Sequence, residues 1–387
     1  MRGKAVVVGA GPAGLSAAIA LARAGMGVTL LEQRSNWPGR VCGGFLNPEG
    51  VGHLRTLGAF DAVVAAGAVE VASSRLTTSG GMDRAVSVTV GGTMGLGVPR
   101  RVLEETLLDV ARELSVTVRM GVRAVAVRRA DGAWAVVARR GSAVEHHLSD
   151  LAVLADGRFS LAATLALKRR QGWFGWNATF GDVPQRPGEL SMHFFPLGYF
   201  GVLTFADGST NVCGLTHIAY NDRRTWGERW QGVLQAQPHL ARLVAGATRI
   251  SDWQGVGPLP FAPAMRPSDG PVLAGDAAAV GDPYMGEGIS RALGTGPILQ
   301  RVLEANTEAP LDAAAVRAAY DRLWARHYAS RLRLGTVVRL LQRRPRLFQG
   351  ALRLVTRRPG LSRAVTRVFH SSSGGREAHS SMWRYER

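Results

Sequence analysis

The 387-residue chain is poor in several features that mark common protein classes. Its two cysteines, Cys42 and Cys213, are too few and too far apart in sequence for a disulfide scaffold or a metal cluster. No run of about eighteen apolar residues is present, so no membrane span is predicted. The first apolar segment begins within a few residues of the N-terminus, and we expect no signal peptide. These features favour a protein of the reducing cytoplasm.

Lysine is almost absent, since Lys4 and Lys168 are the only two, and arginine carries the net charge of +18. The chain lacks an aromatic-interleaved basic motif, zinc-ligand spacing and a helix-turn-helix signal, so we expect no nucleic-acid partner. Residues 322–376 hold fourteen arginines and no acidic residue, with leucine and valine interleaved at helical spacing. Two interpretations stay open: solvated surface helices, or helices that contact an anionic membrane or a substrate-carrier protein.

A glycine-rich segment near the N-terminus has the features of a dinucleotide site. Three glycines have G-x-G-x-x-G spacing: Gly9, Gly11 and Gly14. An apolar run at 5–8 precedes them, helical periodicity follows at 15–23, and a second apolar run at 28–31 ends at Glu32. This pattern predicts a strand, a tight turn, a helix and a second strand. The helix N-terminus would face a pyrophosphate, and the carboxylate would bind ribose hydroxyls.

A second glycine-rich segment, residues 275–290, follows another buried-strand pattern at 272–274. Asp276 ends that strand, where a carboxylate can accept a hydrogen bond from a ribityl hydroxyl. Backbone N–H groups near Gly286 and Gly288, at the start of a predicted helix, can stabilise negative charge on reduced flavin. A simple nicotinamide dehydrogenase does not need this second segment, so the two segments together predict FAD.

The predicted elements give an α/β fold in which one domain is interrupted by another. A Rossmann-like FAD-binding domain of the glutathione reductase type takes three ranges: 1–70, 99–165 and 270–300. A mixed β-sheet substrate domain takes residues 71–98 and 166–269, which alternate in strand fashion and are rich in aromatics. Residues 301–387 form an arginine-rich helical C-terminal region.

The order of these motifs resembles that of the p-hydroxybenzoate hydroxylase-like FAD-dependent oxidoreductases. The motifs that carry the resemblance are Gly9–Gly14, Glu32, Cys42-Gly43, Asp156-Gly157 with Ser160, and Gly275–Gly288. This superfamily includes aromatic monooxygenases, flavin-dependent halogenases and geranylgeranyl reductases. The segments 40–44 and 283–289 are more similar to the geranylgeranyl reductase branch, and the chain also looks like flavoproteins encoded beside polyketide synthases.

The resemblance implies a set of site residues. Those expected at the cofactor are Gly9, Gly11, Pro12, Ala13, Gly14, Glu32, Gln33, Arg34, Arg40, Cys42, Gly43, Arg100, Val125, Asp156, Gly157, Gly275, Asp276, Pro283, Gly286, Glu287, Gly288 and Ile289. Arg100 suits an anionic group of FAD, or is a solvated arginine at the start of a helix. Cys42 is either a catalytic or flavin-adjacent thiol or a small residue packed in a tight loop.

An aromatic segment, residues 192–205, predicts a hydrophobic substrate wall with His193 and Tyr199 as its polar, candidate catalytic contacts. The alternative is a packed core strand. The chain departs from the hydroxylase pattern, because Ala279 stands where those enzymes usually carry histidine. No arginine follows Ser160 in the apolar run to Leu167, which leaves nicotinamide docking by that motif open.

Three functions remain in consideration. We favour a monooxygenase that uses NAD(P)H as a transient electron donor and O2 to oxidise a hydrophobic aromatic or polyketide-type intermediate. The alternative is a flavin-dependent reductase or dehydrogenase of carbon–carbon double bonds in an isoprenoid or polyketide. A non-catalytic flavin-binding, membrane-docking module is the third.

Overall fold

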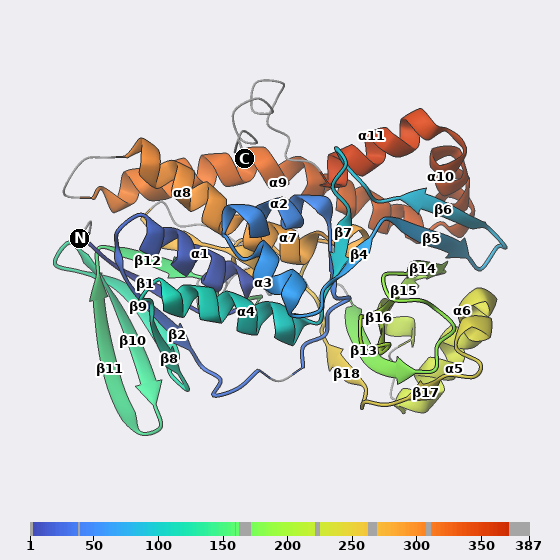
Figure 1. Cartoon of the computed structure of the whole chain (residues 1–387), viewed down its shortest axis with the longest axis horizontal. Helices are drawn as coiled ribbons and strands as arrows, with labels where there is room; N and C mark the ends of the chain where they lie inside the picture. Colours follow the sequence, from blue (N-terminus) through green and yellow to red (C-terminus); the bar gives the residue numbers. More distant parts are fainter. Residues whose placement is uncertain are drawn as a thin grey trace.

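The structure is a computed structural model that describes residues 3–37, 39–158, 160–161, 172–220, 225–261, 269–306 and 311–370. The apolar run up to Leu167 and the end of the chain after His370 lie outside these residues. Two β-sheet regions stand side by side, and the C-terminal helices run along both of them (Figure 1).

A five-stranded parallel sheet forms the first region, in the order β19-β12-β1-β2-β8. Its strands are β1 (Lys4–Val8), β2 (Gly27–Glu32), β8 (Thr117–Met120), β12 (Leu151–Leu154) and β19 (Val272–Leu273). Their near-continuous apolar sequences suit strands that are covered on both faces. The helices α1 (Pro12–Arg23) and α4 (Arg100–Glu113) lie side by side on the sheet in Figure 1. The predicted Rossmann-like α/β fold is confirmed.

A three-stranded antiparallel sheet packs on this region through buried Val136 and Ala138. It consists of β9 (Arg123–Ala130), β10 (Ala133–Arg140) and β11 (Ala143–Ser149). Asp131 and Gly132 make the first turn with φ of 48° and 80°, as a type I′ turn requires. The apolar patterns at 122–128 and 133–139, with the turn signal Asp131-Gly132, predict the first two strands, whereas the polar residues at 145–147 hide the pattern of β11.

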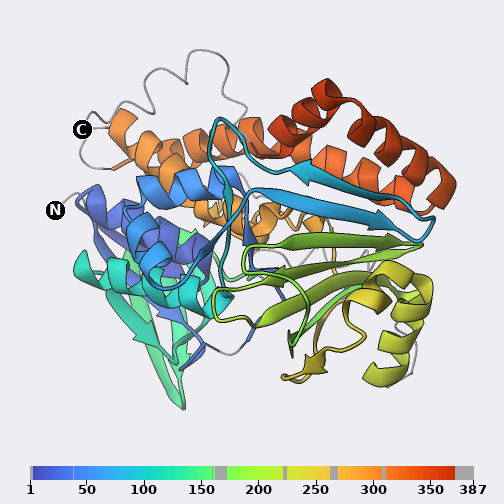
Figure 2. The ribbon, with the colours of Figure 1, turned by 45° about the vertical axis from the view of Figure 1, so that its right-hand side comes forward.

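An eight-stranded mixed sheet forms the second region (Figure 2). Its strands are β5 (Ser73–Thr78), β6 (Asp83–Ser87), β13 (Trp173–Gly181), β14 (Leu190–Phe195), β15 (Gly198–Thr204), β16 (Thr210–His217), β17 (Thr248–Arg249) and β18 (Gln254–Val256). β5 joins the sheet by parallel pairing with β14, so residues far apart in sequence become neighbours. A 3₁₀ turn, η2 (Ile218–Tyr220), follows β16.

Two helices that the strand-like interpretation of residues 166–269 missed cover one face of this sheet. They are α5 (Trp226–Ala236) and α6 (Pro238–Leu243). A capping box starts α5: Glu228 N–H donates to the Thr225 hydroxyl, and the Glu228 carboxylate accepts from Thr225 N–H. Trp230 of α5 packs against Trp176 and Phe200 of the sheet and holds the helix to it.

Short elements join the two regions: β3 (Phe45–Leu46), β4 (Val69–Val71), β7 (Gly95–Gly97), α2 (Pro48–Thr56) and α3 (Phe60–Ala65). After β19 come the 3₁₀ turns η3 (Gly275–Ala277) and η4 (Pro283–Met285), then α7 (Glu287–Leu293) and α8 (Thr295–Ala305). The chain continues as α9 (Ala313–Gln342), α10 (Pro345–Arg357) and α11 (Pro359–His370). None of the helices within the described ranges has the length and apolar character needed to span a bilayer.

Gly14 provides a test of the first turn of α1. A Cβ at this position would lie 1.7 Å from the backbone oxygen of Gly9, which cannot move away as a flexible side chain could. We expect Gly14→Ala to lower the free energy of unfolding by about 3 kcal/mol and to abolish FAD retention. Gly232→Ala in α5 is the control, because no atom lies within 4 Å of its Cβ. Equal denaturation midpoints for Gly14→Ala and Gly232→Ala would contradict the close packing of Gly14 against the Gly9 backbone.

Candidate functional site

The first glycine segment forms an open backbone cradle at the start of α1. Gly9 has a φ of 97°, and Gly11 precedes the helix without a side-chain cap. The nearest atom to a Cβ at Gly11 is Glu104 Oε1, 4.0 Å away, so this backbone can be approached closely. Pro12 and Ala13 are buried in the first turn. Free N–H groups at this helix end suit a pyrophosphate.

Glu32 lies at the end of β2 beside this cradle. Its Oε2 accepts a hydrogen bond from Ala10 N at 2.8 Å, and its Oε1 accepts one from Arg34 N at 3.0 Å. These bonds orient the buried carboxylate and leave further lone pairs for ribose hydroxyls. Gln33, the next residue, is exposed.

Two arginines pair with Glu104 next to the cradle, and Arg34 lies near one of them, Arg40. Arg100 Nη2 lies 2.6 Å from Glu104 Oε1, and Arg40 Nε lies 4.0 Å from it. Each of Arg34, Arg40 and Arg100 has a buried guanidinium nitrogen without a hydrogen-bond partner among the described residues: Arg34 Nη1, Arg40 Nε and Arg100 Nε. Desolvation lowers the pKa of Arg40, although Glu104 opposes this effect. Unpaired guanidinium nitrogens beside an open helix end fit the phosphates of FAD.

Asp156 approaches the same cradle from the end of β12. A Cβ at Gly9 would meet the backbone oxygen of Ala155 at 2.5 Å, which shows how closely these turns pack. Asp156 Oδ2 accepts from Leu161 N at 2.7 Å, while Oδ1 is buried without a partner among the described residues. Burial raises the pKa of this carboxyl group. Gly157, with a φ of 81°, leaves open space beside it.

The second glycine segment contacts the first one directly. Gly275 has a φ of +58°, and a Cβ there would lie 2.8 Å from the Cβ of Ala13. Asp276 pairs with Arg291 of α7 at 3.3 Å and keeps a partly exposed carboxylate, with 42% of its side chain accessible. Ala279 is buried, and its carbonyl accepts from Arg291 Nη2. The residues at both segments therefore fit one extended dinucleotide.

The later part of this segment is held by the inner face of α9. Arg339 binds both carboxylate oxygens of Asp282 at 3.1 Å, and the Tyr284 hydroxyl donates to Gln342 Oε1. Burial raises the pKa of Asp282 to about 6. The motif residue Pro283 is exposed, and Gly286 is left-handed, with a φ of 66°.

A buried ion cluster anchors α7 to α2 and α9. Arg331 Nη1 lies 3.4 Å from Glu287 Oε1, and the same guanidinium makes two hydrogen bonds to Glu49. Burial raises the pKa of Glu287 to about 7 despite the nearby arginine. Gly288 is exposed and open at its Cβ position, whereas Ile289 is buried.

The Cys42 loop lies between the arginine cluster and the eight-stranded sheet. Cys42 Sγ is 4.0 Å from Arg100 Nη1 and accepts from Gly44 N at 3.4 Å, while the Cys42 carbonyl accepts from Asn211 Nδ2 at 2.7 Å. Gly43 is exposed, with open space at its Cβ position. Cys42 therefore adjoins the arginines that fit FAD. Val125 is 38% exposed on β9, three residues after Val122, whose N–H donates to the Glu32 carbonyl.

The structure separates the two polar residues predicted on the aromatic wall. His193 is paired with Phe200 and Tyr199 with Phe194, so the two pairs point to opposite faces of the sheet. His193 is buried and bonded to the Thr77 and Ser191 hydroxyls at 2.8 and 2.9 Å. Burial lowers its pKa to about 3, so the ring is neutral near pH 7. Tyr199 instead faces Tyr284, with ring centroids 4.8 Å apart.

Sequence reasoning missed several residues that complete the site. They are Glu49, Glu104, Arg291, Arg331, Arg339 and Gln342. Glu104 carried a usable signal, because it follows Arg100 by four helical residues. The others pair with residues distant in sequence, and no local pattern identifies such partners.

Arg100 and Arg101 form a matched pair for testing the arginine cluster. Arg100 is mostly buried beside the cradle, whereas Arg101 pairs with Glu105 at the surface. We expect Arg100→Met to weaken FAD binding by roughly 10- to 100-fold, the cost of a lost charge-assisted contact. Arg101→Met should leave affinity unchanged. Arg100→Met leaves the Glu104 carboxylate unpaired, and the double variant Arg100→Met/Glu104→Gln removes that charge as well. If the double variant recovers FAD affinity in a fluorescence titration, the loss came from the unpaired Glu104, and Arg100 does not bind FAD directly.

The raised pKa of Glu287 predicts a pH-dependent difference in stability between the parent and the variant Glu287→Gln. Its pKa is about 7 in the folded chain against 4.5 for the free side chain. Its contribution to the free energy of unfolding is therefore fully present below pH 4.5 and is lost as the pH rises through 7. Glu287→Gln cannot lose this proton. We therefore expect the variant to gain roughly 3 kcal/mol relative to the parent between pH 4.5 and pH 8. Chemical denaturation without added FAD measures this, and a pH-independent difference would contradict it.

Comparison with known proteins identifies the family of this chain. Residues 2–304 match the family described as FAD binding domain. Menaquinone reductase of Mycobacterium tuberculosis is 27% identical, and the alignment covers 79% of this chain and 78% of that protein.

Solved structures share the fold. The flavin-dependent brominase Bmp2 has a TM-score of 0.79 at 17% identity, covering 95% of this chain and 92% of that one. A geranylgeranyl bacteriochlorophyll reductase-like protein of Thermoplasma acidophilum has a TM-score of 0.71 at 20% identity, covering 90% of each chain. The predicted resemblance is confirmed. The chain belongs to the FAD binding domain family and is an FAD-dependent oxidoreductase.

Proposed function

We propose that this flavoprotein is a monooxygenase that hydroxylates the ring of a hydrophobic aromatic substrate, of the phenol or polyketide type. NAD(P)H would supply two electrons and O2 the oxygen atoms. One oxygen atom enters the ring as a hydroxyl group, and the other leaves as water. The observation that carries the proposal is an aromatic wall that joins the eight-stranded sheet to the second glycine segment.

The aromatic wall consists of Phe194, Tyr199, Tyr284 and Phe348. Tyr199 and Phe194 come from the sheet, with ring centroids 5.9 Å apart. Tyr284 belongs to the glycine segment that fits the flavin, and Phe348 of α10 lies 5.3 Å from Phe194. Flat apolar faces of this kind bind an aromatic ring and exclude water from it.

The chain's own residues supply binding and orientation, whereas FAD supplies the redox chemistry when bound. Arg339 and Gln342 hold Asp282 and Tyr284, so the wall is fixed relative to the cofactor segment. Burial raises the pKa of Tyr199 well above its usual value, which keeps its hydroxyl protonated at neutral pH. A protonated Tyr199 can donate a hydrogen bond to a substrate oxygen but cannot act as a base.

A second candidate is reduction of a carbon–carbon double bond in an isoprenoid or polyketide. The similarity to menaquinone reductase favours it, as does Ala279 in place of the histidine usual in aromatic hydroxylases. Both candidates require a hydrophobic substrate beside the same aromatic wall. They differ in their need for oxygen.

Oxygen dependence separates the two candidates. With NADPH or NADH, a long-chain alkylphenol and ¹⁸O2, we expect one ¹⁸O atom in the product and no product under anaerobic conditions. Menaquinone with NAD(P)H, without oxygen, tests the alternative. Anaerobic reduction of a side-chain double bond, with no ¹⁸O uptake from either substrate, would replace the proposed hydroxylation.

Tyr199 and His193 provide a matched comparison within this assay. Tyr199→Leu should raise KM for the ring substrate by about tenfold, the value of one hydrogen bond to a bound group, with an unchanged flavin spectrum. His193→Gln should lower thermal stability and leave KM unchanged, because His193 lies on the opposite face of the sheet. A larger KM effect from His193→Gln would assign the substrate to the other face.

A further inference from the structure

The C-terminal helices present an uncompensated basic and apolar surface. Residues 322–370 contain thirteen arginines and no Asp or Glu. Arg331 and Arg339 turn inward to carboxylates. The large apolar side chains exposed on this side are Val337 (49%), Leu340 (54%), Leu347 (61%), Leu354 (51%), Leu361 (37%) and Val368 (45%). We call these six residues, with the exposed arginines around them, the C-terminal surface.

The exposed residues form stripes rather than scattered positions. Leu347 and Leu354 are seven residues apart on α10, and Leu361 and Val368 are seven apart on α11, so each pair shares one helix face. On α9, Arg333, Val337 and Leu340 follow one another at helical spacing on the exposed side. Alternation of arginine with exposed leucine or valine is typical of helices that lie at a membrane interface.

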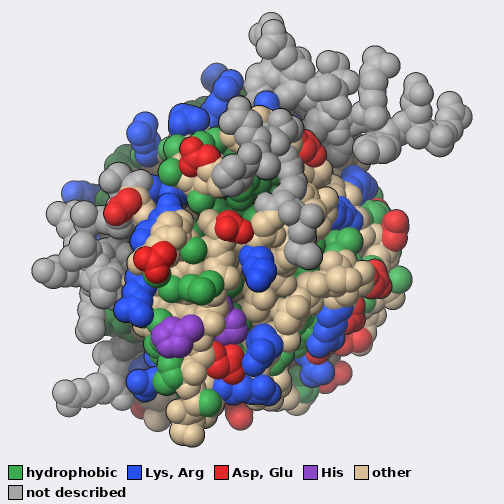
Figure 3. Space-filling view, turned by 90° about the vertical axis from the view of Figure 1, so that its left-hand side faces the viewer, with side chains coloured by type: hydrophobic (Ala, Val, Ile, Leu, Met, Phe, Trp, Pro, Cys, Tyr) green, Lys and Arg blue, Asp and Glu red, His purple; other side chains and the backbone are tan. Residues whose placement is uncertain are grey.

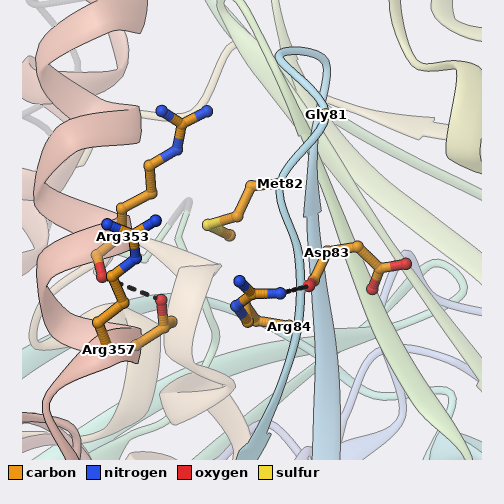
Figure 4. Close-up of a pocket in the computed structure, with 7 residues that line it drawn as sticks. Gly81, Met82, Asp83, Arg84, Arg353 and Arg357 are labelled. Atoms are coloured by element: carbon orange, nitrogen blue, oxygen red, sulfur yellow. Dashed lines mark hydrogen bonds between the residues drawn. The ribbon is translucent and has the colours of Figure 1, made fainter.

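A basic pocket adjoins α10. Its volume is about 280 Å³, and it is lined by Gly81, Met82, Asp83, Arg84, Arg353, Thr356 and Arg357. In Figure 4, Met82 and Arg84 extend from the β5–β6 hairpin toward α10, which contributes Arg353 and Arg357. Asp83 is already bonded to Arg75 at 2.7 and 2.6 Å. Three guanidinium groups around one recess suit a phosphate group.

The inner side of α10 reaches the aromatic wall. Phe348 and Leu352 pack in the cluster that contains Phe194, Tyr199 and Tyr284. Figure 2 shows α10 and α11 beside β5 and β6, at the end of the molecule away from the five-stranded sheet. One helix therefore has the predicted substrate wall on its inner side and the leucine stripe on its outer side.

We propose that the C-terminal surface docks on an anionic phospholipid bilayer. The leucine and valine side chains enter the interface, the surrounding arginines bind lipid phosphates, and the pocket of Arg84, Arg353 and Arg357 takes one headgroup. Charge complementarity selects this partner, because the surface carries arginine without acidic residues. This inference does not depend on the proposed reaction, since docking needs no turnover.

The opposite end of the molecule provides an internal control. Figure 3 shows acidic as well as basic side chains on that face, with apolar side chains among them. The three-stranded sheet β9–β11 there exposes Val144 (54%) and Leu148 (62%) as strongly as the C-terminal surface exposes its leucines. Arg139 and Arg140 are also exposed on β10. These residues match the C-terminal set in chemistry but lie in a surface of mixed charge.

Vesicle flotation of the FAD-loaded full-length protein tests the proposal. Vesicles of phosphatidylcholine, with and without phosphatidylglycerol, are the probes. We expect binding only with phosphatidylglycerol, weakened by salt. Arg353→Gln/Arg357→Gln should weaken binding roughly 30-fold, since each arginine adds about a factor of five at an anionic bilayer. Leu347→Ser/Leu354→Ser should weaken it by about tenfold or more.

The control variants are Arg139→Gln/Arg140→Gln and Val144→Ser/Leu148→Ser, which should bind as the parent does. Failure of the parent to bind anionic vesicles, or equal losses in the control variants, would overturn the proposal. Sedimentation analysis in which Leu347→Ser/Leu354→Ser dissociates a dimer, without vesicle binding by the parent, would identify a second copy as the occupant. Stabilisation by inorganic phosphate without vesicle binding would assign the pocket to a soluble anion.

Discussion

The ion cluster centred on Arg331 is the constraint on which the cofactor side of the molecule depends. Burying a guanidinium group costs several kcal/mol unless carboxylates surround it with good geometry. Arg331 is 2% accessible, and its partners Glu49 and Glu287 are 3% and 10% accessible. The three groups come from α9, α2 and α7. Their contacts join these three helices, so the end of the second glycine segment is positioned by polar contacts as well as by packing.

The long helix α9 has two faces with different roles. Arg331, Arg339 and Gln342 face inward and hold Glu287, Asp282 and Tyr284. Arg333 and Val337 face outward with the proposed docking surface. An arginine on the inner face is paired with a carboxylate and nearly inaccessible to solvent. An arginine on the outer face stays hydrated or exchanges its water for a phosphate group. The same residue type therefore has a structural role on one side and an interaction role on the other.

Local patterns were sufficient to predict the cofactor cradle but not its supports. The glycine spacing at Gly9–Gly14, with the apolar runs around it, predicts one turn geometry because backbone sterics allow few alternatives. Arg331 and Glu49 are 282 positions apart, and no periodicity connects them. His193 and Tyr199 were assigned to one wall, but strand register decides which face a side chain takes, and composition does not reveal register. The capping box at Thr225 was a readable signal for α5 that aromatic content obscured.

The pairing of β19 with β12 has a consequence for how the protein is made. Strand β19, which leads into the turn that holds Asp276, is added to the parallel sheet only after residue 272 has been synthesised, and Arg331 follows later still. Until then a nascent chain exposes the edge of β12 and an unpaired Glu49, and such partly formed sheets are prone to aggregate. The cofactor site can therefore be completed only after most of the 387 residues have been synthesised, because its two glycine segments are separated by more than 250 positions.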